Sequence, residues 1–329
     1  MDYPGEPVHA SDPEARPFES AASERPVHRG WAAAPVWDTR LWLVAAVVAL
    51  VVLLVIVAVL THGRVPGYPV RVNGKFGYID KSGKLIVQPQ YDEAGDFAEG
   101  LAPVKIGSKW GYIDGKGKMV VNPQFDMADP LSDGLALVGA GPKLGYINKD
   151  GKYVINAQYD GAGQFGGGLA PIVMNNRWGY IDKKGQTVIN PQYEEAGNFS
   201  DGLALVRVGQ NYGYIDKSGK VAINPQFQGA GDFHDGLAVV RIGNRFGFID
   251  KHGKYVINPQ FDSAGDFSDG LALVSLEHRF GYVDKHGKYV LNPQFEEAGN
   301  FKGGLAPVWV GGHQGYINKS GKYIWNPTN

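Results

Sequence analysis

The apolar residues of this chain follow two different patterns, one continuous and one interrupted. Twenty consecutive apolar residues run from Leu41 to Leu60 without a charge, a glycine or a proline. A helix of that length spans about 30 Å, the thickness of the hydrocarbon core of a bilayer. From residue 69 onward the apolar residues instead form short runs that are bounded by Gly, Asp and Pro, a pattern typical of β-strands.

The continuous run predicts one transmembrane helix over residues 41–60. Trp42 lies near one end, and Arg40 and Arg64 lie outside the two ends, where amphipathic rings and cations are favoured. A cleaved signal peptide fits less well, because a forty-residue polar segment comes first and no A-x-A pattern follows the run. We therefore expect a disordered polar tail over 1–40, the membrane helix over 41–60, a linker over 61–68 and a repeat domain over 69–329.

The repeat domain consists of one unit that occurs eight times without insertions or deletions. A tract of a basic residue, an aromatic residue, Gly, Tyr, Ile and Asp surrounds a glycine that recurs every 34 residues, at Gly77, Gly111, Gly145, Gly179, Gly213, Gly247, Gly281 and Gly315. Fixed periods of this length are the signature of repeat architectures. Helical repeats of the same period are excluded, because each unit holds several Gly and usually a Pro within its apolar tract.

Each unit predicts three antiparallel strands. In the second unit these are 102–106, 109–113 and 118–122, with Gly107-Ser108 as a hairpin link and Asp114 to Gly117 as the next turn. We expect the third strand to end at the Asn-Pro pair, because proline cannot donate to the ladder. A looser stretch such as 91–97 then leads to the next unit.

Both faces of these strands carry apolar residues, so each small sheet must be covered by its neighbours and the units must stack in series. The predicted fold class is an all-β repeat array, stacked as an open curved solenoid, with a closed eight-bladed propeller-like ring as the alternative. The open form is favoured because the first unit begins with its first strand and the last ends with its third, which leaves no strand to complete a shared blade.

The tracts Lys109-Trp110-Gly111-Tyr112-Ile113-Asp114 and Arg177-Trp178-Gly179-Tyr180-Ile181-Asp182 resemble the WG repeat family, also called KWG repeats. The resemblance covers about residues 69–329. It implies a bacterial β-repeat protein without common catalytic residues. Leu144 and Gln314 depart from the aromatic position. The candidate structural or interaction residues are the aromatic side chains that fill it: Phe76, Trp110, Trp178, Tyr212, Phe246 and Phe280.

Composition narrows the chemistry further. The chain has no cysteine, and its 32 basic residues nearly balance 33 acidic ones. These numbers argue against a disulfide scaffold, a Cys-ligated metal site and a nucleic-acid partner. No nucleotide-binding, metalloprotease or serine-hydrolase motif is present. His252 and His286 share a turn position in successive units, but Ser, Lys and Asp fill it elsewhere. We expect no catalytic residue, no metal and no cofactor.

The leading hypothesis is a non-catalytic, membrane-anchored scaffold whose repeats bind a protein, a peptide or an envelope polymer. The alternative is an envelope sensor that signals through the helix to the amino-terminal tail, and a hydrolase is a weaker possibility. Basic residues flank the apolar run equally on both sides, so charge does not fix the orientation. We expect a single-pass protein with a cytoplasmic amino terminus and extracytoplasmic repeats.

Overall fold

The computed structural model describes residues 67–326, which hold thirty strands in eight antiparallel sheets. The predicted tail, the predicted membrane helix and nearly all of the predicted linker lie outside these residues. Among the residues described, no helix has the length and apolar character needed to cross a membrane.

We call each sheet a blade and number the blades 1 to 8 in chain order. Each blade contains three long strands. The first long strands are β1 (Tyr68–Val72), β5 (Leu101–Ile106), β9 (Ala136–Ala140), β12 (Leu169–Met174), β16 (Leu203–Val208), β20 (Leu237–Ile242), β24 (Leu271–Leu276) and β28 (Leu305–Val310). The second are β2 (Lys75–Ile79), β6 (Lys109–Asp114), β10 (Lys143–Ile147), β13 (Arg177–Asp182), β17 (Asn211–Asp216), β21 (Arg245–Asp250), β25 (Arg279–Asp284) and β29 (His313–Asn318). The third are β3 (Leu85–Tyr91), β7 (Met119–Phe125), β11 (Tyr153–Tyr159), β14 (Thr187–Tyr193), β18 (Val221–Phe227), β22 (Tyr255–Phe261), β26 (Tyr289–Phe295) and β30 (Tyr323–Trp325).

Six blades have a fourth strand, which the sequence did not predict. It pairs with the free edge of the first long strand and lies within the stretch expected to be a linker. These strands are β4 (Glu93–Ala94), β8 (Met127–Ala128), β15 (Glu195–Ala196), β19 (Gly229–Ala230), β23 (Ser263–Ser268) and β27 (Glu297–Ala298). Blade 4 has a single bridge between Ala162 and Ile172 at this place. Most of the fourth strands have only two residues, which is too few to produce an alternating pattern in the sequence.

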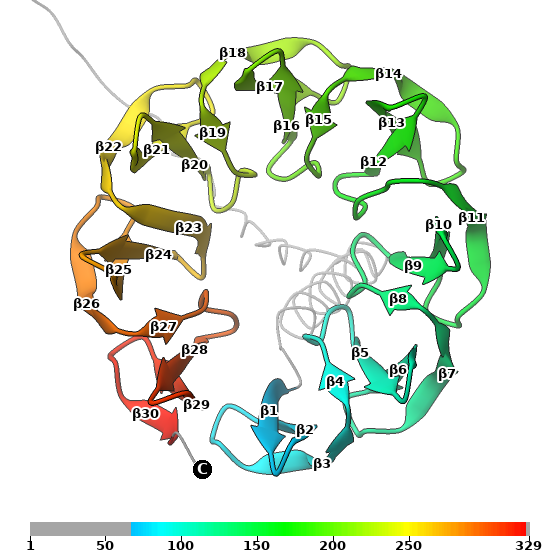
Figure 1. Ribbon diagram of the computed structural model, residues 1–329, viewed down its shortest axis with the longest axis vertical. Helices are drawn as coiled ribbons and strands as arrows, with labels where there is room; N and C mark the ends of the chain where they lie inside the picture. The colour runs from blue at the N-terminus through cyan, green and yellow to red at the C-terminus, as the bar shows by residue number, and fades with distance from the viewer. Residues whose placement is uncertain (1–66, 327–329) are drawn as a thin grey trace, which may run out of the picture. The chain divides into compact units, whose positions relative to one another are not determined.

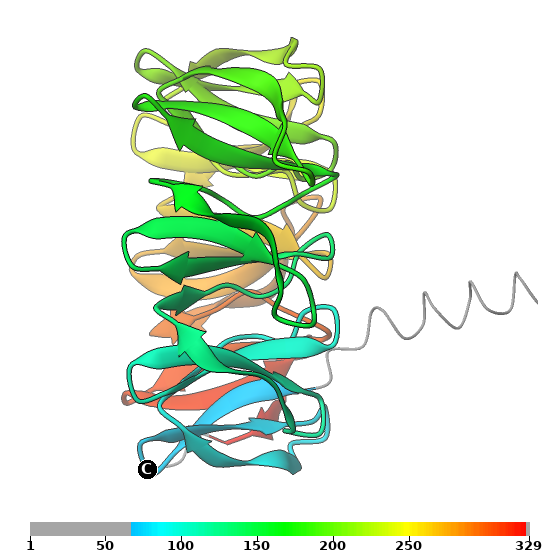
Figure 2. The same cartoon turned by 90° about the vertical axis from the view of Figure 1, so that its right-hand side faces the viewer.

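The eight blades form a closed ring, a β-propeller, so the prediction of an open solenoid was wrong and its alternative was right. Figure 1 shows the blades in chain order around the ring, with the third long strands along its outer rim. Figure 2 shows the same blades from the side. No shared strand is needed for closure, because side chains, rather than a strand, join the last blade to the first.

The third long strand does not end at the Asn-Pro pair. In blade 5 it runs through Pro225 to Phe227, and its pairing with β17 shifts register between Tyr212 and Tyr214. Gly213 lies at this irregularity, where an added Cβ would come within 2.6 Å of the Ile223 carbonyl oxygen. The recurring glycine therefore admits the backbone of its own third strand, and the proline lies where the ladder is already interrupted.

The turn between the second and third long strands is as predicted. In blade 2 the Asp114 carboxylate accepts hydrogen bonds from the backbone N–H groups of Lys116 and Lys118, both at 2.9 Å. These two bonds hold the pKa of Asp114 below its usual range. Gly117 closes the turn with a φ of 79°, a conformation that costs glycine little.

The apolar core lies between blades. Each cluster of buried residues draws on two adjacent blades, as Tyr214 and Ile223 of blade 5 pack with Phe233 and Ile249 of blade 6. The Tyr214 ring centroid lies 4.7 Å from that of Phe233, and its hydroxyl donates to the Gly231 carbonyl at 2.8 Å. This aromatic pair recurs with small changes at most junctions, which we call seams, and explains why no blade could stand alone.

The seam between blades 8 and 1 is closed by different residues. Every other blade has Ala at the position of Tyr68. The Tyr68 ring packs 5.7 Å from that of Tyr316 and takes the place of the missing Phe. Its hydroxyl donates to the Gly303 carbonyl at 2.9 Å, and the Tyr316 hydroxyl donates to the Pro69 carbonyl at 2.9 Å. These groups join segments more than 230 residues apart in sequence.

Candidate functional site

One surface of the propeller carries the turns between the first and second long strands, and we call it the hairpin face. At the seam between blades 1 and 2, the Asp92 carboxylate accepts a hydrogen bond from Lys75 Nζ at 2.5 Å and another from the Gly107 N–H at 2.8 Å. Its own N–H donates to the Lys105 carbonyl at 3.0 Å. One acidic residue therefore joins a cation of one blade to the hairpin of the next.

This unit is repeated around the ring. Equivalent ion pairs join a basic residue to an acidic residue 17 positions later: Lys109–Asp126, Lys143–Asp160, Arg177–Glu194, Arg245–Asp262 and Arg279–Glu296. The side chains of most of these pairs are about 30–55% exposed, and exposed pairs of this kind contribute little to stability. They nevertheless give the hairpin face a regular series of charges of both signs.

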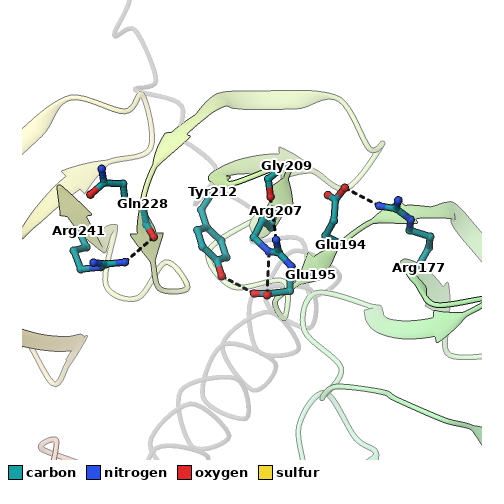
Figure 3. Close-up of polar contacts among 8 residues, drawn as sticks. All are labelled: Arg177, Glu194, Glu195, Arg207, Gly209, Tyr212, Gln228 and Arg241. Atoms are coloured by element: carbon teal, nitrogen blue, oxygen red, sulfur yellow. Dashed lines mark hydrogen bonds and ion pairs between the residues drawn. The ribbon is translucent and has the colours of Figure 1, made fainter. Parts of the chain in front are cut away.

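The regular series changes over blades 4, 5 and 6 (Figure 3). Glu195 accepts a 2.6 Å hydrogen bond from the Tyr212 hydroxyl and lies 2.9 Å from Arg207 Nε. The bond to Glu195 raises the pKa of Tyr212, whereas Arg177 holds the pKa of Glu194 below its usual range. At the next seam Gln228 replaces the acid, and its backbone carbonyl accepts from Arg241 Nη2 at 3.0 Å. Blade 5 thus has a different polar surface from its neighbours.

The predicted aromatic residues lie beside this network. Each is half-buried and packs against the cluster between its own blade and a neighbour: Phe76, Trp110, Trp178, Tyr212, Phe246 and Phe280. Their position supports a packing role. Their role in binding another molecule stays a prediction.

The opposite surface carries the inner loops and the Asp-to-Gly turns, and we call it the turn face. Successive inner loops are linked by an acidic side chain that accepts from the N–H of a glycine 35 residues later, as Asp235 does from Gly270 at 2.8 Å. Asp235 itself has a φ of 55°. The Lys285 ammonium donates to the Asp235 carbonyl at 2.6 Å. Acidic residues of the turn face thus join neighbouring inner loops.

Two half-buried aspartates on the inner loops depart from this pattern. Asp232 and Asp266 hold equivalent positions in blades 6 and 7, and each lies against a glycine of the preceding blade. Burial, together with Asp266, raises the pKa of Asp232 to about 6. Burial also raises the pKa of Asp266, whose carboxylate lies 3.8 Å from His234 Nε2. The repeat pattern did not single out this pair, because three other blades also have Asp or Asn at the same position.

Among the clefts that residues 67–326 form, two lie at seams. One, of about 410 Å³, lies between the hairpins of blades 1 and 8 and is lined by Arg71, Asn73, Gly74, Phe76, Trp309, Gly312, His313 and Gln314. The other, of about 380 Å³, lies between blades 6 and 7, where Gly229 leaves room beside Arg241, Phe246 and Asp266.

The two turn histidines show no sign of a metal site. The His252 side chain is 92% exposed. Across residues 67–326, no three side chains of His, Cys, Asp and Glu come together as metal ligands would. Asp250 and Asp284, which precede these histidines, accept backbone N–H groups of their own turns.

A family model described as "WG containing repeat" matches the chain over residues 76–110, 110–139, 145–178, 178–212, 212–246, 246–277 and 280–312. The chain belongs to the WG repeat family. The resemblance noted from the sequence is thereby confirmed across residues 76–312, and Leu144 and Gln314, which depart from the aromatic position, lie outside the matched segments. No curated protein matches the chain.

Solved structures similar to this WG repeat protein are distant in sequence. One is the dihydro-heme d1 dehydrogenase NirN in complex with DHE, at 13% identity and a TM-score of 0.53, covering 79% of this chain and 72% of that one. Another is a eukaryotic initiation factor, at 10% identity and a TM-score of 0.50, covering 78% of this chain and 94% of that one. At such identities the likeness concerns the fold alone, so it does not decide whether the chain is an enzyme.

Proposed function

We propose that this WG repeat protein is a non-catalytic scaffold that binds a protein or peptide through the hairpin face of its propeller. The observation that carries the proposal is the repeated unit of a half-buried aromatic ring, a cation and an acid at successive seams. Repeated units of one chemistry offer several similar contacts to one partner, which raises avidity without any reaction. A catalytic centre instead requires a few groups that are unique to one place.

The polar side chains support this assignment, because the repeated ones contact the next blade, the next loop or their own turn. Acids of the hairpin face bind the next blade, acids of the turn face bind the next loop, and the Asp-to-Gly turns use their own carboxylates. The half-buried aromatic rings of the repeated unit would also suit contact with an envelope polymer.

We further propose that residues 41–60 hold the scaffold at a membrane, with the repeats outside the cytoplasm. The support is the uninterrupted apolar run and the absence of cysteine, which suits an oxidising compartment. Protease added to intact cells is expected to digest the repeats. Digestion only after the inner membrane is breached would place the propeller inside the cell.

Binding is tested with the purified full-length chain, cross-linked to its neighbours in an envelope fraction and analysed by mass spectrometry. We expect partners whose cross-links fall on the hairpin face and are reduced by the charge reversal Arg177→Glu. The matched control is Lys285→Glu on the turn face, which should leave them unchanged. A chain that retains nothing, or whose cross-links fall evenly on both faces, would refute the proposal.

A further inference from the structure

The seam between blades 8 and 1 lacks a strand that most other seams have. In six blades a short strand pairs with the edge of the first long strand, and in blade 4 Val173 donates to the Gly161 carbonyl at the same place. Within residues 67–326, nothing pairs in this way with β1. The consequence is visible at Arg71, which is exposed, whereas the seven residues at its position in the other blades are half-buried or buried.

The other seams show what kind of segment fits there. At the seam between blades 1 and 2 it is Tyr91-Asp92-Glu93-Ala94, and at the seam between blades 7 and 8 it is Phe295-Glu296-Glu297-Ala298. Backbone pairing of the short strand covers the neighbouring edge, as Glu93 pairs with Lys105. The acid that follows the aromatic residue binds a hairpin N–H of the next blade, as Asp92 binds Gly107 and Asp126 binds Gly141, both at 2.8 Å.

The seam between blades 8 and 1 holds the complementary groups. His313 has the position of Lys75, Arg71 that of Lys105, and Asn73 that of Gly107. They line the 410 Å³ cleft, together with the rings of Phe76 and Trp309 and with no acidic side chain. The Arg71 guanidinium carbon lies 5.8 Å from the ring centroid of Phe76, its partner on β2, so the cation lies over an aromatic ring that also lines the cleft.

Only part of the seam is open. Tyr68 and Tyr316 fill the depth of the seam, where the Phe of an inner loop would otherwise pack. The cleft therefore lies where the aromatic residue, the acid and the two-residue strand lie at other seams. It does not extend to the position of the inner loop that follows them. A segment of about four extended residues matches this space.

We propose that this seam is a docking site for an extended acidic peptide of a partner protein, with the order aromatic, acidic, any residue, Ala. The peptide adds an antiparallel strand to β1, its acid binds Arg71, His313 and the Asn73 N–H, and its aromatic side chain packs against Trp309 and Phe76. Addition of a strand to an open sheet edge is a general mode of peptide recognition. The assignment rests on the proposed scaffold function and names the ligand class of that scaffold.

The test uses a fluorescent peptide with the sequence of residues 292–299, Asn-Pro-Gln-Phe-Glu-Glu-Ala-Gly, added to the full-length chain in detergent micelles. Anisotropy is expected to show saturable one-to-one binding. The Glu296→Lys change in the peptide and the Arg71→Glu change in the protein should each weaken binding at least tenfold. The matched control is Arg241→Glu, at the same position in blade 6, where Gly229 and Ala230 already cover the edge; it should change affinity less than twofold.

Hydrogen exchange supplies a measurement that needs no variant. Peptide addition is expected to slow exchange of the Arg71 and Asn73 amides and to leave the equivalent Lys105 and Gly107 amides unchanged. Absence of binding, binding that Arg71→Glu leaves intact, or protection elsewhere on the ring would overturn the proposal.

The chain itself holds a similar segment, Phe18-Glu19-Ser20-Ala21. If deletion of residues 1–35 raised the affinity for the peptide tenfold, the site would belong to the chain's own amino-terminal segment, and the assignment to a partner protein would be overturned. Retention of the cross-linked partners by an Arg71→Glu chain that no longer binds the peptide would refute this site and leave the scaffold standing. Loss of peptide binding and of all partners from the unmodified chain would refute both.

Discussion

The seam between blades 8 and 1 and the seam between blades 5 and 6 both join adjacent blades, but through different residues. At the regular seam, the Tyr214 ring packs edge-to-face against Phe233, which an inner loop supplies, and a short strand covers the edge above it. At the closing seam, Tyr68 replaces that Phe from within β1 and the edge above it is open. The closing cluster has five buried residues, against seven to nine in the other clusters. Closure of the ring thus requires the buried aromatic contact but not the short strand at the surface. The edge of β1 that such a strand would cover is the proposed ligand site.

The largest expected effect comes from removing the deep contact. Tyr68→Ala restores the residue found in every other blade, yet it should lower the free energy of unfolding by about 3–5 kcal/mol, because it leaves a cavity beside Tyr316. Phe233→Ala at the regular seam should cost a similar amount. Chemical denaturation monitored by tryptophan fluorescence measures both. A loss below about 1 kcal/mol for Tyr68→Ala alone would mean that the closing seam is not packed as described.

The next effect concerns the pH dependence of a regular seam. Burial and Asp266 raise the pKa of Asp232 to about 6, while His234 and the backbone of Asn198 oppose this. A carboxyl that holds its proton more tightly when folded stabilises the protein at low pH, and that stability is lost as the pH rises from about 4 through 6. Asn fills the equivalent positions 198 and 300. Asp232→Asn should therefore stabilise the protein by about 1–3 kcal/mol at pH 7 and by much less at pH 4.

Melting temperatures at the two pH values measure this difference. Asp96→Asn is the matched control, since Asp96 has the equivalent position beside the closing seam and an ion pair with Lys302. An equal gain at both pH values for Asp232→Asn would contradict the raised pKa.

A smaller effect is expected from the tyrosine hydroxyls. Tyr316→Phe removes a donor to the Pro69 carbonyl, and Tyr214→Phe removes one to the Gly231 carbonyl. Each should cost about 1 kcal/mol, because both acceptors are partly buried. Phe248 has the same position in blade 6, so a phenyl ring fits there. Denaturation midpoints that differ between the two variants by more than their error would show that the closing hydroxyl has a separate role.

The smallest effect is expected at the exposed ion pairs. Lys302→Ala removes the 3.1 Å pair with Asp96, which joins the inner loops of blades 8 and 2 beside the closing seam, and Arg245→Ala removes the pair with Asp262 at a regular seam. Both should change the free energy of unfolding by at most about 1 kcal/mol, and less at high salt. A salt-independent loss of several kcal/mol for Lys302→Ala would assign ring closure to this pair instead of to Tyr68.

The sequence predicted the parts of this fold that lie within one unit. The spacing of Gly77, Gly111 and their equivalents gave the eight units, and the Asp114 to Gly117 segment gave the turn that the structure confirms. The three long strands followed from the short apolar runs, although their ends did not, because the register shift beside Gly213 lets the third strand pass through Pro225.

Contacts between units were harder to predict, because a period in sequence does not fix the angle between successive blades. Ring closure depends on the side chains of Tyr68 and Tyr316. A repeat pattern describes what the units share, so it does not predict contacts that only the first and last units make. A signal was present, since Tyr68 is the one departure from an alanine column. The opening at Arg71 could be recognised only after the ring was known, because its chemistry depends on His313 from the other end of the repeat domain.

The central claim is that the ring of blades is closed, and a zero-length cross-link between the inner loops of blade 8 and blade 2, which are the neighbours of blade 1, tests it most directly. Lys302 Nζ lies 3.1 Å from Asp96 Oδ2 although the two residues are 206 positions apart. Treatment of the dilute full-length monomer with a carbodiimide, followed by mass spectrometry, should therefore give an intramolecular Lys302–Asp96 amide. The Lys75–Asp92 pair at a regular seam serves as the internal control. Formation of both links is the predicted result, and formation of the Lys75–Asp92 link without the Lys302–Asp96 link would contradict a closed ring.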